Sequence, residues 1–592
     1  MPEEIIPIQS QAGIARDGTT LSSPFYSDGK WVRFQRGLPR KMGGYRSINK
    51  YVEEIGRQLH EYTQDTRTYL HVGSANKVER LYIDGSFNTS IISDRTPTSS
   101  FTADPQNLWQ FASVYDTASG NTLLAQVAPN LGCICNTTGG ELFSGDLLGT
   151  APLTRVTAVP ANFDATGGVV ALPPYAVVYG ADGYVAWSTP NSPSSFIGSG
   201  AGNAYVTSQK IVRAMPLRGG PGNTPSGLFW SADSLIRASY VGGSAIFSFD
   251  TLSSQSSILS ADCVVEYDGV YYWAGTDRFL MFNGVVREIP NTLNLNFFFD
   301  NLNSEQRQKV FGFKVPRFGE IWWCFPKGSS SEPNHAIVYN VRENTWYDTA
   351  LPDSGRGAAV SPSVFPNPLM TGVDAQDYQL DSVSISSGGS SYTAGDVLTI
   401  SGGTALIYAE LTVDSVNGGT GEIVSVSVSN AGRYTTLPTN PVSASGGSGS
   451  GAEFDLTFIR PYKLWVHEVG KDAVDGELVA PVQSFFETAP ISLPATGKGS
   501  NSLQVLMLEP DFVQSGDMSV QVTGRANARA PQVDGDRLFF ADSAATPQEQ
   551  VVYLKTQRRE LRFRFESNTV GGDYQMGLVL AHVRRGDGTT IG

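Results

Sequence analysis

The sequence predicts a mainly β protein with three parts: a β-propeller, a carboxy-terminal β-sandwich or barrel-like domain, and a small inserted β module. The 63 Gly and 33 Pro residues among 592 disfavour long helices and suit short strands joined by tight turns. Charged residues reach only 17% whereas aromatic residues reach 11%, which favours packed apolar cores. Because the chain is too long for one core, we expect about two to four domains.

The amino-terminal segment, residues 1–51, is predicted to join the carboxy-terminal domain. From Lys30 to Lys50 it holds seven basic residues and no acidic one, interleaved with large apolar side chains. Basic residues mixed with aromatic ones are typical of phosphate contacts with nucleic acid. The alternation of Trp31 with Arg33 and of Phe34 with Arg36 favours another interpretation. In it, a strand packs on one face, and its arginines form a rim that pairs with acids of a neighbouring subunit.

Residues 52–365 are predicted to form the propeller. Three stretches share one pattern, an aromatic or apolar strand followed by a turn with Asp or Asn and a second strand: His71–Gly85, Phe229–Arg237 and Trp273–Gly284. Repeated four-strand units of about 40 to 50 residues are the mark of a β-propeller. A pair of β-sandwiches is the alternative. One short helix is expected after Asn303, which can cap it.

Residues 375–458 are predicted to form a separate inserted module made of two copies of one strand-rich unit. Ser382–Ser386 matches Ser425–Ser429. Each copy continues with a tyrosine, Tyr392 or Tyr434, then with a Ser-Gly-Gly turn and a further strand. We expect these two tyrosines to be core anchors rather than platforms for a sugar.

The inserted module is strongly acidic. Between Thr371 and Phe458 nine acidic residues stand against a single basic one, Arg433. This segment therefore carries more than half of the chain's net charge of −14. We interpret the module as an exposed decoration domain, with a receptor- or glycan-binding module as the alternative.

Residues 461–592 are predicted to form the carboxy-terminal β domain, which ends in a hairpin. The first strand shows the period of two of a half-buried strand, with apolar Leu561, Phe563 and Phe565. Turn residues follow, and a return strand alternates in the same way from Tyr574 to Leu580. A charged rim is formed by Arg558, Arg559, Arg562 and Arg564.

The sequence contains no motif for catalysis or for a cofactor. It has no glycine-rich phosphate loop and no Gly-x-Ser-x-Gly stretch, and His467-Glu468 lacks the second histidine of a zinc protease motif. Asp233 and Asp277 could be the paired carboxylates of a propeller glycosidase. Both stand at recurrent turn positions, where Asp hydrogen-bonds its own backbone. We therefore expect no enzyme, no cofactor and no metal.

Three features of the sequence bear on the cellular location of the protein. No apolar run is long enough to span a membrane, and Glu3 and Glu4 stand where a secretory signal needs positive charge. Four cysteines are expected to be buried free thiols, as in a protein made in a reducing cytoplasm: Cys133, Cys135, Cys263 and Cys324.

Several separated stretches resemble the tail nozzle family of short-tailed bacteriophages, also called tail tube or packaged-DNA-stabilisation proteins. They occur in this order: Asp28–Phe34 with Gly37–Pro39 and Gly43–Tyr45, Lys210–Arg213 with Arg218–Gly220, Trp465–Gly470, Ser484–Thr488 and Glu566–Gly577. Each stretch is a weak pattern, but the ordered set is fairly specific. Together they span nearly the whole chain except the insert.

The resemblance implies a structural protein of the virion tail, made and assembled in the host cytoplasm. It implies a homo-hexameric ring below the portal and adaptor ring, with a propeller beside a β platform domain. Genomic double-stranded DNA is retained by this ring and passes through its channel during ejection, and tail fibres or other tail proteins bind nearby. The alternatives are a receptor- or glycan-binding tail adhesin and a propeller glycan hydrolase.

We place the subunit or adaptor contacts of such a ring on the basic and aromatic residues of the two ends of the chain. The predicted contact residues are Lys30, Trp31, Arg33, Phe34, Arg36, Arg40, Lys41, Arg558, Arg559, Arg562 and Arg564.

Overall fold

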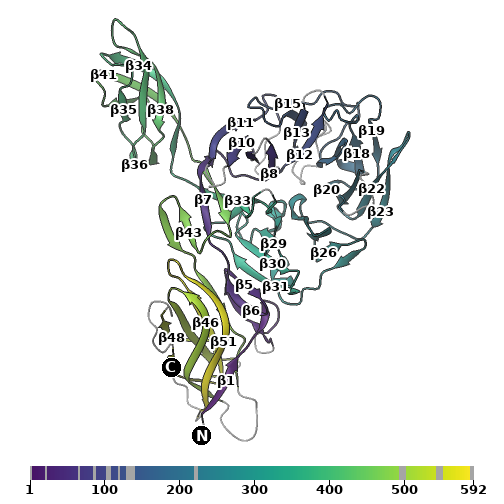
Figure 1. The fold of residues 1–592 in the computed structure, drawn as a ribbon, viewed down its shortest axis with the longest axis vertical. Coiled ribbons are helices and arrows are strands. Elements are labelled where there is room, and N and C mark those ends of the chain that lie inside the picture. Colours follow the sequence, from purple (N-terminus) through teal and green to yellow (C-terminus); the bar gives the residue numbers. More distant parts are fainter. Residues whose placement is uncertain are drawn as a thin grey trace. The chain divides into compact units, whose positions relative to one another are not determined.

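The computed structural model describes residues 3–19, 23–64, 67–83, 89–101, 108–117, 120–128, 141–218, 225–363, 365–492, 502–527, 529–541 and 551–586. The chain forms two compact units. Unit 1 comprises Met1–Asn49, Gly56–Thr371 and Trp465–Gly592, and unit 2 comprises Lys50–Ile55 and Gly372–Leu464. Figure 1 shows that strands dominate the described chain. The fold is mainly β, with a propeller and a sandwich-like platform in unit 1 and an inserted β module in unit 2.

Six four-stranded antiparallel sheets follow one another in the described part of unit 1 and form propeller blades. In every sheet each strand pairs with the next one along the chain. The strands of blades 1 to 3 are β8 (Gln58–Gln64), β9 (Arg67–Gly73), β10 (Val78–Ile83), β11 (Thr89–Asp94), β12 (Leu108–Asp116), β13 (Gly120–Ala128), β14 (Glu141–Asp146), β15 (Thr154–Arg155), β16 (Gly168–Leu172), β17 (Tyr175–Tyr179), β18 (Tyr184–Trp187) and β19 (Gly202–Tyr205). Those of blades 4 to 6 are β20 (Ile211–Pro216), β21 (Ser226–Ser231), β22 (Leu235–Gly242), β23 (Ile246–Ser253), β24 (Val265–Tyr267), β25 (Val270–Ala274), β26 (Phe279–Phe282), β27 (Val286–Glu288), β28 (Phe311–Val315), β29 (Glu320–Phe325), β30 (His335–Asn340) and β31 (Thr345–Ala350).

A seventh sheet closes the ring of blades. Its order begins β32-β33-β42-β7, with β32 (Arg356–Val360), β33 (Leu369–Ala375), β42 (Tyr462–His467) and β7 (Tyr45–Val52). Its innermost strand, β32, packs against β28 of blade 6 and against β8 of blade 1. The hairpin β43 (Asp472–Asp475) and β44 (Leu478–Pro481) continues from β7. An early strand of the chain thus completes the last blade, and in the sequence the inserted module comes between the strands β33 and β42 of that blade.

Buried tryptophans tie successive blades together. Trp109 in blade 2 donates its indole N–H to the backbone oxygen of Ser74 in blade 1, at 2.6 Å. Trp323 in blade 6 donates to the backbone oxygen of Cys263, which precedes blade 5, at 2.8 Å. Both indoles have no exposed surface, and a buried N–H group needs such a partner. The aromatic strands noted in the sequence are the second strands of blades 1, 4 and 5: β9, β21 and β25.

The platform is a sandwich of two sheets. One sheet has the order β49-β46-β51-β6-β5, with β1 paired to β51, and the other has the order β4-β45-β50-β47-β48. Their strands are β1 (Glu4–Ile8), β4 (Asp28–Lys30), β5 (Val32–Gln35), β6 (Leu38–Lys41), β45 (Ser484–Glu487), β46 (Leu503–Ser515), β47 (Met518–Arg525), β48 (Val533–Phe540), β49 (Val552–Arg558), β50 (Glu560–Ser567) and β51 (Asp573–Arg585). Strands β2 (Gln11–Ile14) and β3 (Phe25–Tyr26) come between β1 and β4 in the sequence and form a parallel pair. β2 packs on β31 of blade 6.

The predicted carboxy-terminal hairpin is wrong, although both of its strands exist. β50 pairs with β45 and β47, whereas β51 pairs with β46, β1 and β6. The two strands thus belong to opposite sheets, and Phe563 and Phe565 pack with Tyr574 and Met576 in the core between the sheets. Two consecutive strands with an apolar face can pair side by side in one sheet or face each other from the two sheets of a sandwich. Alternation alone does not distinguish these cases.

The helix predicted after Asn303 is present as a short 3-10 helix, Ser304–Lys309, and the Asn303 side chain accepts a hydrogen bond from the Glu305 N–H. Two further one-turn 3-10 helices are Ala181–Gly183 and Ala261–Cys263. Sequence reasoning missed the α-helix α1 (Leu295–Asn301). Cys263 and Cys324 are buried free thiols, as predicted. Cys133 and Cys135 lie outside the described residues.

Unit 2 has a core of its own. Its strands are β34 (Gln379–Ser390), β35 (Val397–Ile400), β36 (Thr404–Ile407), β37 (Glu410–Val416), β38 (Ile423–Asn430), β39 (Arg433–Thr436), β40 (Val442–Ser445) and β41 (Ser450–Ile459). Six of them form one sheet, and β36 pairs with β39. Tyr392 and Tyr434 are 3% and 0% exposed within this core. Their predicted role as core anchors is confirmed.

Candidate functional site at the junction of the propeller and the platform

The β5–β6 hairpin of the platform carries most of the basic and aromatic residues singled out near the amino terminus. Its turn residues Arg36 and Gly37 have φ values of 54° and 77°, the positive values that tight two-residue hairpins use. Phe34 packs edge-on against Tyr347 of blade 6 at 5.5 Å between ring centroids. Both Arg33 and Phe34 are 1% exposed. Strand β5 is therefore covered on both faces, and only its turn reaches the surface.

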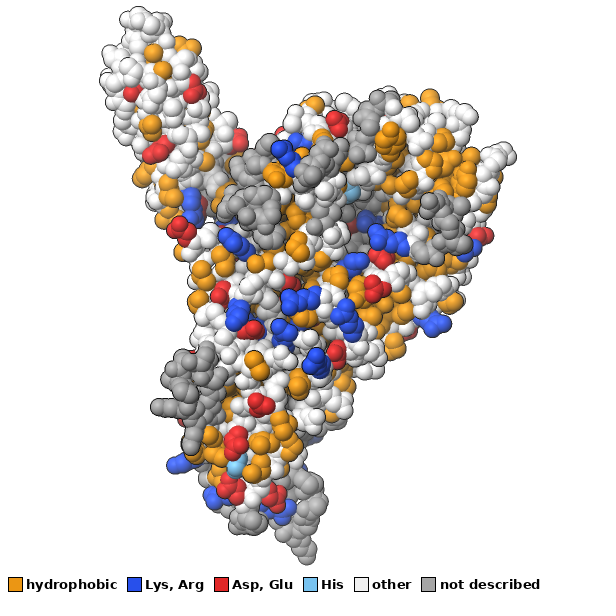
Figure 2. Space-filling view, in the orientation of Figure 1, with side chains coloured by type: hydrophobic (Ala, Val, Ile, Leu, Met, Phe, Trp, Pro, Cys, Tyr) orange, Lys and Arg blue, Asp and Glu red, His pale blue; other side chains and the backbone are white. Residues whose placement is uncertain are grey.

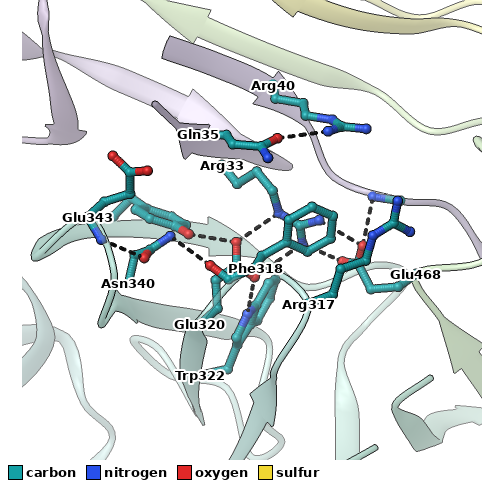
Figure 3. A network of polar contacts seen from close by, with 12 residues as sticks. Arg33, Gln35, Arg40, Arg317, Phe318, Glu320, Trp322, Asn340, Glu343 and Glu468 are labelled. Atoms are coloured by element: carbon teal, nitrogen blue, oxygen red, sulfur yellow. Dashed lines mark hydrogen bonds and ion pairs between the residues drawn. The ribbon is translucent and has the colours of Figure 1, made fainter. Parts of the chain in front are cut away.

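Arg33 is the centre of a buried ion triad. Its guanidinium contacts both carboxylate oxygens of Glu320 on β29, at 2.8 and 3.1 Å. It also contacts both oxygens of Glu468, which follows β42, at 2.8 and 2.5 Å. Figure 3 shows the two carboxylates on either side of the guanidinium. Bidentate pairs of this kind combine charge with planar geometry, which fixes the orientation of the partners.

Neutral groups complete the surroundings of the triad. The ring of Phe318 lies 3.7 Å from the Arg33 guanidinium carbon. The Glu320 carboxylate also accepts hydrogen bonds from the Trp322 indole at 2.9 Å and from the Tyr347 hydroxyl at 2.7 Å. Burial alone would lower the pKa of Arg33, but the two carboxylates outweigh it and raise that pKa above its usual range. The arginine is held charged, and one positive charge faces two negative ones.

A second polar cluster lies where the amino-terminal segment meets blade 6. Arg16 pairs with Asp348 on β31 at 2.9 Å and with Asp28 on β4 at 2.7 Å. His335 of β30 approaches the same Asp348 carboxylate at 2.9 Å. Burial would raise the pKa of Asp348, but Arg16 and His335 outweigh it and lower that pKa. Arg16 thus links platform strand β4 to the propeller.

The predicted contact residues of the amino-terminal segment are found in three kinds of surroundings. Four are buried inside unit 1: Trp31, Arg33, Phe34 and Lys41. Two are half-buried and donate hydrogen bonds to glutamine side chains: Lys30 and Arg40. One is exposed: Arg36. The buried side chains bind the chain's own platform and propeller, so the surface available to another subunit is that of Arg36 and its two half-buried neighbours.

Lys41 shows how tightly this segment is packed. Its ammonium group donates a 2.6 Å hydrogen bond to the backbone oxygen of Gly572, and its side chain is 3% exposed. Burial lowers the pKa of Lys41 to about 8, and Asp472 and Asp573 only partly oppose that effect. Lys41 therefore holds the loop before β51 rather than facing solvent.

The four carboxy-terminal arginines divide in the same way. Arg558 and Arg562 are buried, Arg564 is half-buried, and Arg559 is exposed. Arg562 pairs with Glu487 at 3.3 Å and with Glu560 at 3.0 Å. The Arg564 guanidinium carbon lies 3.5 Å from the centre of the Phe485 ring. The predicted charged rim is largely an internal ladder of ion pairs on the platform, with Arg559 at its surface.

Figure 2 shows Lys and Arg side chains gathered on one face of unit 1, over the region where Figure 1 labels β5 and β29 to β31. Arg36 belongs to this junction, because its backbone N–H donates to the Glu343 carboxylate at 2.9 Å. The junction thus has an ion-paired centre and a basic surface.

Sequence reasoning missed the acids of the junction. Glu320 and Glu468 lie 287 and 435 positions from Arg33 along the chain, so no local pattern connects them. One signal was available: Glu320 stands immediately before the apolar strand Ile321–Phe325, where an acid has no local reason to be. Glu468 lies in one of the stretches that carry the family resemblance.

Polar side chains also connect blades across the propeller. The Gln58 amide of blade 1 and the Arg213 guanidinium of blade 4 both donate to Asp262 Oδ1, just before blade 5, each at 3.1 Å. Burial raises the pKa of Asp262, and Arg213 only partly offsets it. These inner strands are therefore cross-linked around the propeller axis.

The two carboxylates considered for a hydrolase do not form a pair. Asp233 is on the exposed β21–β22 turn, where its carboxylate accepts a 3.0 Å hydrogen bond from the Ser231 hydroxyl. Asp277 is on the β25–β26 turn of the next blade and pairs with its neighbour Arg278 at 2.9 Å. Both lie on turns as the sequence predicts, but they bond the side chains of Ser231 and Arg278 rather than their own backbone. Among the described residues no cluster of His, Cys, Asp or Glu could hold a metal ion, and no helix is long and apolar enough to cross a membrane.

No protein-family model matches the chain, and no curated protein matches it. Among solved structures, the WD40 β-propeller domain of Doa1 aligns with 55% of this chain and 93% of its own length, at 12% identity and a TM-score of 0.33. An ancestral GH74 enzyme aligns with 58% of this chain and 49% of its own length, at 11% identity and a TM-score of 0.35. Both are distant, and the propeller assignment stands on the blades described above.

Proposed function

We propose that the chain is a structural virion protein, a subunit of a ring-shaped, homo-hexameric tail nozzle of a short-tailed bacteriophage. The ring attaches below the portal and adaptor, retains packaged double-stranded DNA and conducts it during ejection. It also docks tail fibres or other tail proteins. Two grounds support this proposal: the sequence resemblance to the nozzle family and the architecture of unit 1.

The observation that carries the proposal is the fusion of propeller and platform into one body. One core cluster crosses their boundary and runs from Trp322 and Tyr347 in blade 6 to Phe563 and Tyr574 in the platform, while the other blades have clusters of their own. Domains in one chain usually move against each other unless the interface is large and apolar. Here the interface is apolar and also holds the Arg33 triad. A subunit that transmits load between stacked rings needs this rigidity.

A conduit must also let DNA slide. Tight phosphate binding along the bore would hinder ejection, because each neutralised phosphate adds to the affinity. Arg16 and Arg33 inside the junction are paired with acids of the same chain, and the chain's net charge is −14, more than half of it in the inserted module. An acidic bore would repel the duplex over a distance of about 8 to 10 Å at physiological salt.

The test uses the exposed arginines of the two ends. Because Arg36 and Arg559 are exposed, Arg36→Glu and Arg559→Glu should leave folding intact while placing a negative charge at the proposed contacts. Arg287→Glu, on the exposed strand β27 of blade 5, is the matched control. We expect wild type and control to form rings in negative-stain images and mass photometry, and the double variant to stay monomeric and give tail-less particles.

A monomeric wild-type chain, in the presence and absence of adaptor rings, would refute the ring. Rings that form equally well in the double variant would retain the nozzle but remove these two arginines from its contacts.

A tail adhesin is the second candidate, and one observation favours it. The inserted module is a compact unit with its own core, which suits a domain that touches an outside partner. Deleting residues 375–458 distinguishes an adhesin from a structural role for the module. Intact particles that no longer adsorb would support the adhesin, whereas a loss of assembly would support a structural role for the module.

A further inference from the structure

The inserted module is built from two halves that exchange strands. Strands β34, β35 and β37 of the first half match β38, β40 and β41 of the second. With these matches, the sheet order β34-β41-β40-β35-β37-β38 is the same when it is read from either end. β34 of the first half pairs with β41 of the second, and β38 of the second half pairs with β37 of the first. The central pair, β35 with β40, joins the two halves.

Close backbone approaches confirm that the two halves match around one glycine and one alanine each. Gly389 has a φ of 63° and Gly432 one of 67°. A Cβ on Gly389 would lie 2.7 Å from the backbone nitrogen of Ala452, and one on Gly432 would lie 2.6 Å from that of Ala409. Each half therefore places its glycine against the alanine of the other, and both positions need glycine for the same reason.

This correspondence gives an internal comparison that shows what the fold needs. Counting back from the matching alanines Ala409 and Ala452, Ile407 corresponds to Ser450 and Leu406 to Gly449. The strand register agrees, because Ile407 lies opposite Arg433 on β39 as Ser450 lies opposite Ser390 on β34. The same architecture is thus satisfied by Gly-Ser, and the apolar Leu-Ile pair is not required for folding.

The apolar stretch is exposed on a free strand edge. Leu406, Ile407 and Tyr408 are 67%, 47% and 43% exposed. They lie at the end of β36, which pairs only with β39 in this fully described unit. Figure 2 shows hydrophobic side chains at the end of the module where Figure 1 labels β36. An exposed apolar edge strand is a template for strand addition.

The chemistry of the module selects the occupant. Arg433, opposite Ile407 on β39, is paired with Asp377 at 2.9 Å, so the one base between Thr371 and Phe458 is neutralised. Exposed acids remain on the module: Asp381, Asp414, Glu422, Glu453 and Asp455. A second copy of the module would bring the same negative charge, which disfavours that partner. Aliphatic Leu406 and Ile407 are suited to apolar side chains rather than to a sugar.

We propose that β36 is a docking strand for an extended segment of another protein that carries apolar and basic side chains. The segment adds to the free edge of β36, its apolar residues cover Leu406 and Ile407, and its basic residues face the acidic module. This inference concerns unit 2 alone and holds whether or not the chain forms a nozzle.

The test measures binding of the full-length chain to a strand-length peptide that alternates lysine with valine. A peptide with glutamate in place of lysine is the probe control. Leu406→Gly combined with Ile407→Ser copies the second half of the module and leaves Tyr408 in its contact with Tyr434. We expect this variant to bind the lysine peptide at least about tenfold more weakly, which corresponds to about 1.4 kcal/mol. Binding by wild type should also weaken as salt is added.

Val424→Ser is the matched control, since Val424 is 62% exposed on the same module and should leave binding unchanged. Circular dichroism of each variant checks that the module is folded. Equal binding of the lysine and glutamate peptides, or equal binding by wild type and the Leu406/Ile407 variant, would overturn the proposal. It would also be overturned if the variant changed the oligomeric state, which indicates a second copy, or if it lost binding to an array of glycans.

Discussion

Arg33 shows how one side chain can join two domains. Two carboxylates from distant parts of the chain share its guanidinium, which is 1% exposed. Removing two carboxylates from water is costly, and their bonds to the arginine and to neighbouring neutral donors offset that cost. The net worth of the triad is therefore modest, but the loss of its central charge is severe.

We expect Arg33→Met to lower the free energy of unfolding of unit 1 by about 3 to 5 kcal/mol, because it leaves Glu320 buried without a counter-charge. Chemical denaturation followed by tryptophan fluorescence measures the change. Arg287→Met, at the surface of blade 5, should change it by less than about 0.5 kcal/mol. Adding Glu320→Gln and Glu468→Gln to Arg33→Met should recover stability. If it does not, packing rather than charge is the cause.

His582 predicts a pH dependence at the edge of the platform. Its ring nitrogens lie 2.8 Å from the Glu3 carboxylate and 2.7 Å from that of Glu509. Partial burial would lower the pKa of His582, but Glu3 and Glu509 outweigh it and raise that pKa above 6.5. The charged ring therefore contributes stability that is fully present below about pH 6.5 and is lost as the pH rises through the raised value.

The measurement is the difference in melting temperature between wild type and His582→Gln across this range. We expect wild type to be the more stable at pH 6, with the difference shrinking as the solution becomes alkaline. A difference that is constant with pH would show that the ring acts by shape and not by charge.

At the scale of the element, alternation identified strands well but not their partners. Leu561, Phe563 and Phe565 were correctly placed on the inner face of a strand, yet the predicted hairpin partner lies in the opposite sheet. The period of two gives the face that is buried, whereas pairing depends on contacts between distant segments. The same limit explains the arginines. The sequence showed that Arg33 alternates with apolar residues but not that Glu320 covers it.

Some element-level predictions succeeded because they depend on local chemistry. Aromatic strands with an Asp or Asn turn recur as the middle strands of blades 1, 4 and 5. The repeated unit of the insert was visible because both halves keep the same glycines and tyrosines. The seventh blade was invisible to such reasoning, since its strands come from both ends of the propeller segment.

Strand β2 supplies a prediction at this scale. Gly13 has a φ of 118°, and a Cβ there would lie 2.5 Å from Leu293 Cδ1 and 2.6 Å from Thr345 Oγ1. Gly13→Ala should therefore loosen β2 from β31, with a cost of about 1 to 3 kcal/mol from overpacking. Gly18→Ala is the control, because Gly18 has a positive φ of 84° but no atom within 4 Å of the added Cβ. Hydrogen exchange of the β31 amides should rise in the first variant only.

At the scale of the whole molecule, the two units are stabilised by different hydrophobic cores. Blade 6 of the propeller shares one core with the platform, whereas the inserted module has a separate one. Composition and repeats were enough to predict three β parts, but only the three-dimensional core shows that two of these parts are joined.

Calorimetry can test this division. We expect the chain without residues 375–458 to lose one unfolding transition and to keep the transition of unit 1 at its original temperature. Propeller and platform should unfold together in that remaining transition. A shift of more than a few degrees would mean that the module supports unit 1, and a split transition would mean that the platform melts by itself.

The closure of the seventh blade has a consequence for biosynthesis. Its outer strand, β7, ends at Val52, whereas its partner β42 begins only at Tyr462. At roughly 5 to 20 residues per second, the ribosome needs on the order of 20 to 80 seconds to bridge that interval. During this time six blades emerge without a closed ring, and the waiting strand is open to mispairing. Slower translation or a missing chaperone should therefore lower the yield of this chain more than that of a propeller closed by neighbouring strands.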